Sequence, residues 1–318
     1  MIDGRNASPA KNKKESRMIG VKKIAHATYE TPDLDQQIEY CTDILGLGLI
    51  AREKDTAYLA STIDHHSVVL LKGDSARCVR IGFQLGIDDD IDAFEKQTAA
   101  HGIKIVRKKD PEPSIAEMAS FEDPKGTVME VFKRGEPSHQ KFPDKGIVPH
   151  KLGHVAFFVK DVKGTTDFYC NVLGFRVSDW MGDFFSFLRC GTDHHTINLM
   201  RADGDRHFHT AFELRDWGHM LTACDYLSLH GYKLLWGPGR HGIGHNLFTY
   251  HRAPNGLITE LFAQLDQMNR SSATSSRGPG TVTGRSGQRS GRQTPMRQTI
   301  GAWEHRRKCA SRKTRRHR

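Results

Sequence analysis

The chain has 318 residues, of which 37% are hydrophobic and 26% are charged. This composition is sufficient to bury a core, so it excludes a wholly disordered chain, and the length is typical of two domains. The sequence has no apolar run of about 18 residues, the length that predicts a transmembrane helix, so no membrane partner is expected.

The net charge of +10 is concentrated at the C-terminal end of the chain. From Arg270 onward lie 14 of the 47 basic residues and one of the 37 acidic residues, which leaves the preceding part with a net charge of −3. A basic tail binds polyanions weakly and without sequence preference. We therefore expect no specific nucleic-acid partner.

The two ends of the chain lack the features of a folded domain. Residues 1–19 contain basic residues but no apolar segment of a secretory signal, and they are expected to form a flexible leader. Residues 266–318 are rich in Ser, Thr, Gly and Arg without periodicity, which predicts a disordered basic tail. The six cysteines form no CxxC pair, which favours free thiols and a cytoplasmic location.

The rest of the chain is an internal repeat with a shift of 128–130 residues. KKIAHATYETPDLD at 22–35 matches HKLGHVAFFVKDVK at 150–163, and FEDPKGTVMEVF at 121–132 matches YHRAPNGLITELF at 250–262. The repeat predicts two copies of one supersecondary unit, at 20–134 and 150–265, joined by a linker at 135–149. It pairs His26 with His154, His66 with His195, Arg80 with His209, and Glu130 with Glu260.

Each copy predicts the same order of elements, most clearly in the second copy. An alternating strand opens the copy, an amphipathic helix ends at Gly174, and a glycine-rich loop, GPGRHG at 237–242, presents His241. Short strands and two helices of this kind favour an α+β fold. The strands are expected at 151–159, 175–179, 184–189, 194–200, 208–214, 246–251 and 257–263, and the helices at 161–173 and 217–230.

His154, His209 and Glu260 are the candidate metal ligands of the second copy. Each lies on a separate predicted strand among apolar residues, and a carboxylate within LITELF is costly to bury unless it is paired or bound to a metal. Two imidazoles and a carboxylate that meet inside a curved sheet form the facial triad of a non-haem Fe(II) site, and Mn(II) suits the same ligands. The alternative is that each is an ordinary polar residue of the core or surface.

These and neighbouring segments resemble the catalytic domain of the type I extradiol ring-cleavage dioxygenases. This family includes catechol 2,3-dioxygenases and biphenyl-2,3-diol 1,2-dioxygenases and belongs to the vicinal oxygen chelate (glyoxalase/bleomycin resistance/dioxygenase) superfamily. Together with the repeat, the resemblance covers about residues 20–265. The segments that carry it include GHVAFFVKDV (153–162), DHHTINL (193–199), HTAFEL (209–214), GPGRHGIGHNLFTY (237–250) and APNGLITELF (253–262).

The resemblance implies a fold and an activity. The fold is α+β, with tandem vicinal oxygen chelate domains built of paired βαβββ modules that form open curved mixed sheets. The activity is cleavage of a catechol-type ring beside its vicinal hydroxyls with O2, in the degradation of aromatic compounds. The resemblance to this family also implies that the protein forms a homo-oligomer.

The resemblance also implies residue roles. It places the family's metal ligands, for Fe(II) or Mn(II), on His154, His209 and Glu260. It places the acid/base histidine on His195 and the groups near the substrate oxygens on His241 and Tyr250. All three of these residues, together with Phe187, are expected to contact the substrate.

The first copy departs from this pattern at one ligand position. It keeps His26, His66 and Glu130 but has Arg80 where the second histidine ligand is expected, and a guanidinium cannot ligate a cation. Arg80 is instead expected to pair with Glu130, and the first copy is expected to be non-catalytic. This also disfavours a glyoxalase-like site built from both copies.

Three alternative functions remain open from the sequence. The chain could be an O2-independent metal-dependent isomerase or lyase of the same superfamily, which would not require His195, His241 and Tyr250. It could also be a non-enzymatic protein that binds an aromatic ligand, or a nucleic-acid binder that acts through its tail. Deletion of residues 270–318 would abolish only the last of these.

Overall fold

Within the described residues, the first half of the chain contains eight strands and three helical segments. The computed structural model describes residues 18–133, 135, 145–269 and 275–276, so most of the expected leader and tail lies outside the described residues. The elements of the first half are β1 (Lys23–Thr31), α1 (Leu34–Glu39), a π-helical turn η1 (Tyr40–Ile44), β2 (Gly48–Arg52), β3 (Thr56–Ala60), β4 (Val68–Lys72), β5 (Arg77–Gln84), α2 (Ile91–Ala99), β6 (Val106–Glu112), β7 (Ile115–Glu122) and β8 (Val128–Phe132).

The second half repeats this order. Its first helix is longer than α1, and a short pair of strands follows the repeat. The elements are β9 (Lys151–Val159), α3 (Val162–Leu173), β10 (Arg176–Met181), β11 (Phe185–Arg189), β12 (Ile197–Arg201), β13 (Arg206–Glu213), α4 (Trp217–Leu229), β14 (Leu234–Arg240), β15 (Leu247–Arg252), β16 (Ile258–Ala263), β17 (Gln267–Met268) and β18 (Ser275–Ser276).

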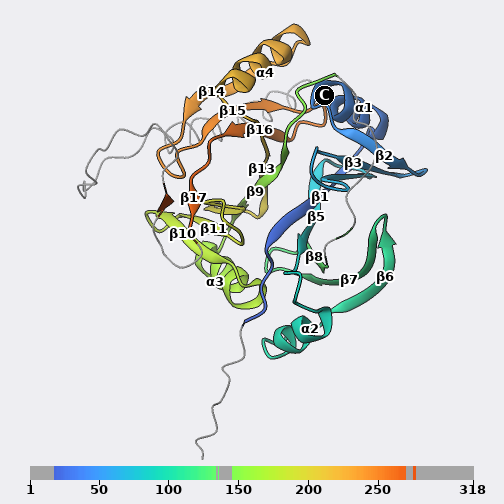
Figure 1. Cartoon of the computed structure of the whole chain (residues 1–318), viewed down its shortest axis with the longest axis vertical. Helices are drawn as coiled ribbons and strands as arrows, with labels where there is room; N and C mark the ends of the chain where they lie inside the picture. Colours follow the sequence, from blue (N-terminus) through green and yellow to red (C-terminus); the bar gives the residue numbers. More distant parts are fainter. Residues whose placement is uncertain (1–17, 134, 136–144, 270–274, 277–318) are drawn as a thin grey trace, which may run out of the picture. The chain divides into compact units, whose positions relative to one another are not determined.

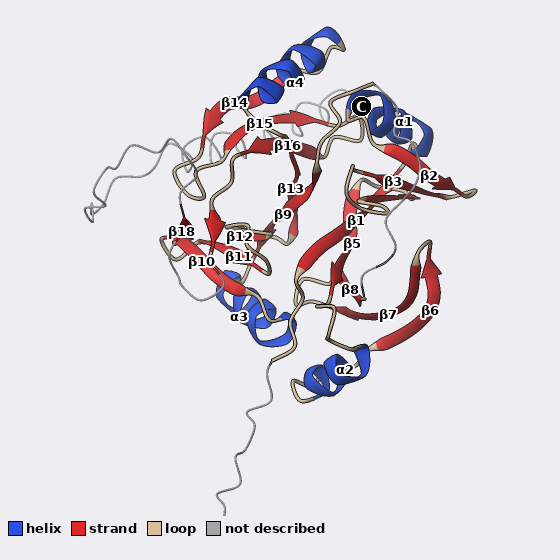
Figure 2. Cartoon of the chain, viewed as in Figure 1, coloured by secondary structure: helices blue, strands red, loops and turns tan. Residues whose placement is uncertain are grey.

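Two curved sheets with the same strand order result from the repeat (Figures 1 and 2). The first has the order β2-β3-β4-β1-β5-β8-β7-β6 and the second the order β10-β11-β12-β9-β13-β16-β15-β14. Each sheet mixes parallel pairs, such as β13 with β16, and antiparallel pairs, such as β13 with β9. The predicted fold of tandem βαβββ modules in open curved mixed sheets is therefore confirmed.

The helix α3 shows how the local sequence sets an element. Its side-chain cap is Asp161, which accepts a hydrogen bond from the backbone N–H of Gly164 at 2.9 Å. It ends at Gly174, whose φ of 73° lies in the left-handed region that favours glycine. The predicted helix at 161–173 is confirmed to within one residue.

The GPGRHG segment differs from its prediction as a loop. Residues up to Arg240 belong to β14, an edge strand that pairs with β15, and His241 follows directly. The ring of Phe248 packs on the backbone at Gly239, where a Cβ atom would lie 2.9 Å from the ring. The glycines therefore allow a close approach of an aromatic ring, and the irregular register beside them hides the alternation that predicts a strand.

A tyrosine from the first helical region of each half reaches across to the other half. Tyr40, which follows α1, places its hydroxyl 2.7 Å from Nε2 of His251 on β15. In the same way, the hydroxyl of Tyr169 on α3 donates to the Asp123 carboxylate of the first half at 2.9 Å. One hydrophobic core extends across both halves, so the two copies are interlocked.

The described chain continues past residue 265, where the basic tail was expected to begin. Asp266 accepts a contact from His245 Nδ1 at 2.7 Å, and Met268 is buried and donates its backbone N–H to Thr192. These residues pack against the segment between β11 and β12. Among the described residues, the five cysteines are free and no helix has the length and apolarity needed to cross a membrane.

Candidate metal centre

His154, His209 and Glu260 converge at one point inside the second sheet. They lie on β9, β13 and β16, three neighbouring strands, and each side chain is almost fully buried. Nε2 of His154 and Nε2 of His209 each lie 3.0 Å from Oε2 of Glu260, and the two nitrogens are 3.3 Å apart. The three residues that the sequence placed on separate strands are therefore brought together.

The spacing of these three atoms fits one face of an octahedral metal site. Atoms that bind an ion at about 2.1 Å in adjacent octahedral positions lie about 3 Å apart. The Nδ1 atoms of both histidines are buried and have no hydrogen-bond partner among the described residues. The contacts at Nε2 are therefore the polar interactions that hold the two rings, and the donor set suits Fe(II) or Mn(II).

Glu260 is held as a carboxylate by its neighbours. Burial opposes its ionisation, but attraction to His154 and hydrogen bonds with the histidines outweigh burial and keep the pKa of Glu260 well below its usual range. Its second oxygen, Oε1, accepts a hydrogen bond from Asn246 Nδ2 at 3.1 Å. Asn246 was not among the predicted site residues, because it was expected as the first residue of a strand at 246–251 and no local pattern pairs it with Glu260.

His195 lies directly beside the converging side chains. It is buried just before β12, and its ring centroid is 4.4 Å from that of His154 and 5.5 Å from that of Phe187. Burial and the neighbouring histidines hold the pKa of His195 well below its usual range, so the imidazole is neutral at neutral pH. Phe187 on β11, the predicted aromatic wall, thus contacts a predicted proton-transfer residue.

His241 and Tyr250 approach from the β14–β15 edge. His241 Nε2 lies 3.0 Å from the Tyr250 hydroxyl and 3.6 Å from Oε1 of Glu260. Burial, together with nearby Glu260, raises the pKa of Tyr250 well above its usual value, so its phenol keeps its proton. His195, Tyr250 and His241, three of the four site residues predicted outside the triad, therefore lie around it, and the fourth, Phe187, packs on His195.

Two aromatic side chains of this edge were not predicted from the sequence. His241 stacks on Phe248 with ring centroids 3.8 Å apart, and Trp236 stacks in parallel on Tyr250 at 5.6 Å. These contacts fix the planes of both polar rings. Trp236 lies in a strand that the sequence did not predict, which is why its position was missed.

The corresponding place in the first half holds an ion-pair cluster. Arg80 on β5 has the same register as His209 on β13, and its Nη1 lies 3.1 Å from Oε1 of Glu130, as the sequence predicted. A second carboxylate, Glu112 at the end of β6, lies 3.3 Å from the same nitrogen. Ser120 stands opposite Glu130, where Tyr250 stands opposite Glu260 in the other half.

Comparisons with known proteins agree with this arrangement. The chain is 27% identical over 267 residues to metapyrocatechase 2 of Cupriavidus necator, covering 77% of this chain and 82% of that protein. It is 26% identical to a manganese-dependent 2,3-dihydroxybiphenyl 1,2-dioxygenase of Geobacillus genomosp. 3, covering 76% and 85%. A Mn(II)-bound glyoxalase from Novosphingobium aromaticivorans superposes with a TM-score of 0.75 at 25% identity, covering 88% and 99%.

A family model matches both halves of the chain separately. It describes the Glyoxalase/Bleomycin resistance protein/Dioxygenase superfamily and aligns with residues 23–131 and 151–261. These two ranges correspond to the two sheets and account for more than half of the chain. The chain belongs to the Glyoxalase/Bleomycin resistance protein/Dioxygenase superfamily.

Proposed function

We propose that this protein is an extradiol dioxygenase that opens a catechol-type ring beside its two hydroxyls and incorporates both atoms of O2. The observation that carries the proposal is the convergence of His154, His209 and Glu260, with ligand atoms 3.0–3.3 Å apart, beneath His195, His241 and Tyr250. The names of the relatives, metapyrocatechase and dihydroxybiphenyl dioxygenase, support the same reaction class.

The three converging side chains would hold Fe(II) or Mn(II). When bound, the metal provides coordination positions for the two vicinal oxygens of the substrate and for O2, which brings both reactants together. The protein contributes a water-poor site, because His154, His209 and Glu260 are almost fully buried. Asn246 holds the Oε1 atom of Glu260, which leaves Oε2 turned toward the two histidines.

The surrounding residues would control the protons of the reaction. Tyr250 keeps its proton and can donate a hydrogen bond to a substrate oxygen, while His241 can exchange a proton with that oxygen or with the phenol. His195 is neutral and buried, so it can donate its N–H to oxygen as negative charge develops. Phe187, which packs on His195, would form part of the wall around the aromatic ring.

The proposal also covers the oligomeric state, the cellular location and the partners of the protein. We infer a homo-oligomer in the cytoplasm that acts on a small catechol and has no specific nucleic-acid or membrane partner. The free cysteines of the described residues suit a reducing cytoplasm, and the names of the relatives support a catechol-type substrate.

The decisive test is anaerobic reconstitution of the full chain with Fe(II) or Mn(II), followed by oxygen-uptake assays with a panel of catechols. Ring cleavage is expected to consume O2 and to form a yellow ring-opened product. His209→Ala is expected to lose bound metal and turnover together, whereas His230→Ala, at the exposed end of α4, serves as the control. Turnover in His209→Ala would refute the ligand assignment.

A second candidate is an O2-independent isomerase or lyase, which the similarity to a Mn(II)-bound glyoxalase favours. The same reconstituted protein distinguishes the two activities, because an isomerase or lyase would act on its substrate without O2. Activity under strictly anaerobic conditions, with no O2 uptake on any catechol, would select this second candidate.

A further inference from the structure

We propose that the first half holds a second divalent-metal site, formed by His26, His66 and Glu112. The three side chains are buried, and their ligand atoms lie within 4.8 Å of one another. This site does not coincide with the position of the candidate metal centre in the second half, because Arg80 occupies the position in the first half that corresponds to the ligand His209. The proposal does not depend on ring cleavage, since it concerns metal binding alone.

The distances from the Glu112 carboxylate to the two histidines suit one ion. Nε2 of His66 lies 3.1 Å and Nε2 of His26 lies 3.7 Å from Oε2 of Glu112. Two atoms bound to one ion at about 2.1 Å lie between about 3 Å and about 4.2 Å apart, depending on the angle between the bonds. Both measured distances fall in this range.

Arg80 holds the carboxylates without filling the site. Its Nη1 contacts Oε1 of Glu112 and Oε1 of Glu130, so the Oε2 atoms of both carboxylates remain turned toward the histidines. Asn246 does the same for Glu260 in the second half, where it donates to Oε1 and leaves Oε2 facing the histidines. By this comparison Arg80 is a positioning residue.

The two places present the same charge to a metal ion. When the imidazoles are neutral, as metal binding requires, Glu112, Glu130 and Arg80 together carry a net charge of −1, which is also the charge of Glu260 in the second half. Arg80 therefore does not cancel the negative charge that attracts a cation, because Glu112 lies at the same place. A divalent ion brings each place to the same net charge of +1. Without a metal, burial opposes protonation of His26, but Glu112 and Glu130 outweigh burial and raise the pKa of His26 above its usual value.

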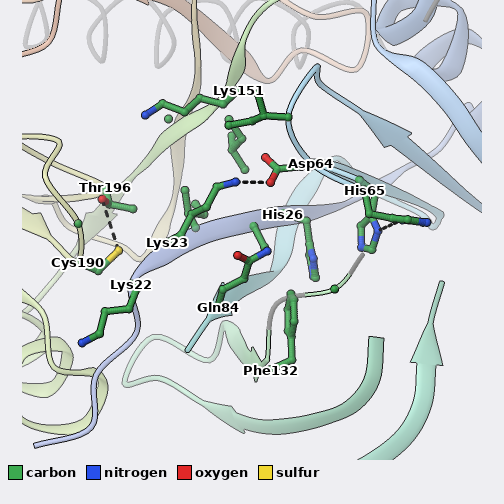
Figure 3. Close-up of a pocket in the computed structure, with 18 of the residues that line it drawn as sticks. Lys22, Lys23, His26, Asp64, His65, Gln84, Phe132, Lys151, Cys190 and Thr196 are labelled. Atoms are coloured by element: carbon green, nitrogen blue, oxygen red, sulfur yellow. Dashed lines mark hydrogen bonds and ion pairs between the residues drawn. The ribbon is translucent and has the colours of Figure 1, made fainter. Parts of the chain in front are cut away.

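Two of the three proposed ligands, His26 and His66, line a cavity, and His66 has a second contact. A cavity of about 460 Å³ is lined by His26, His65, His66 and Phe132, and Figure 3 shows His26 and Phe132 side by side in it. Their rings stack with centroids 5.6 Å apart. Nδ1 of His66 lies 3.0 Å from Nδ1 of His65, a contact that can fix the tautomer with a free Nε2.

The experiment uses the metal-free full chain, with Co(II) as the probe, and measures bound metal per chain after desalting. The wild-type protein is expected to bind two ions. His209→Ala is expected to bind one, with a visible absorption spectrum that belongs to the first half. The double variant His209→Ala with Glu112→Gln should bind no ion. The control double variant, His209→Ala with Glu117→Gln on the neighbouring strand β7, should still bind one ion.

Three results would overturn the proposal. The first is that the wild-type chain binds only one ion. This result is obtained on the wild-type protein and so does not depend on the folding of any variant. The second is no ion in folded His209→Ala. The third is an ion in His209→Ala that survives Glu112→Gln, since it would then be bound elsewhere. If the Glu112→Gln chain fails to fold, as judged by circular dichroism, His66→Gln replaces it and the same outcomes apply.

Discussion

The two halves of this protein place the same carboxylate at the same strand position but surround it differently. Glu260 faces two histidines, and a phenol stands on the neighbouring strand, whereas Glu130 faces one histidine and an arginine, with Ser120 on the neighbouring strand. The backbone register is the same in both sheets. Which half can perform the proposed chemistry is therefore decided by a few side chains and not by the fold.

The most severe test of this comparison converts one half into the other. His209→Arg copies the arginine of the first half, and its guanidinium is expected to pair with Glu260 and exclude a metal. Ring cleavage should fall to the background rate, and the metal that belongs to the second half should be lost, as oxygen uptake and metal analysis would show. Arg206→His, on the same strand, is the control; if His209→Arg kept its activity, the two halves would not differ in the way described.

A second test separates proton transfer from metal binding. His195→Ala removes the neutral imidazole beside His154 and should lower kcat by about 10²–10⁴-fold while bound metal per chain stays unchanged. The measurement is steady-state oxygen uptake together with metal content. Loss of metal in step with kcat would show that His195 acts on the ligand His154 instead of on a substrate.

A third test concerns the residue that orients the carboxylate. Asn246→Ala leaves Oε1 of Glu260 without its amide donor, and metal affinity should weaken by about 10–100-fold. A competition titration with a metal chelator measures this change. Gln264→Ala, an exposed amide just after β16, should not alter the affinity, and an equal effect of both variants would argue against a specific role for Asn246.

A fourth test concerns the contact between the halves, away from the candidate metal centre. Burial lowers the pKa of His251 to about 3, below its ordinary value of about 6.5 in an unfolded chain. Between these values only the unfolded chain takes up the proton, so stability should fall as the pH drops from about 6.5 toward 3, by about 1.4 kcal/mol per pH unit.

Chemical denaturation at several pH values tests this expectation. His251→Gln should reduce the pH dependence of the free energy of unfolding by the amount that corresponds to one proton. His230→Gln, at an exposed histidine, should leave this pH dependence unchanged. An unchanged slope in His251→Gln would mean that His251 already binds a proton in the folded protein. The corresponding contact of Tyr169 with Asp123 contains no histidine, so the effect is confined to one of the two contacts.

Much of the candidate site could be predicted from local sequence. The alternation of apolar residues placed His154 and Glu260 on strands, and the repeat showed that Arg80 stands where His209 stands. The pairing of Arg80 with Glu130 followed from charge alone and is confirmed. Glu112 could not be predicted in the same way, because it lies at the end of an edge strand and has no acidic counterpart in the second copy.

The sequence by itself determined the repeated fold, the strand alternation and the residues that can bind a metal, because these depend on short-range periodicity and side-chain chemistry. Only the tertiary structure decided that Asn246 reaches Glu260, that Glu112 joins the cluster at His26, and that Tyr40 contacts His251 across the halves. These contacts join residues 14, 86 and 211 positions apart, so no local pattern encodes them. Sheet curvature and the packing of one copy on the other bring them together.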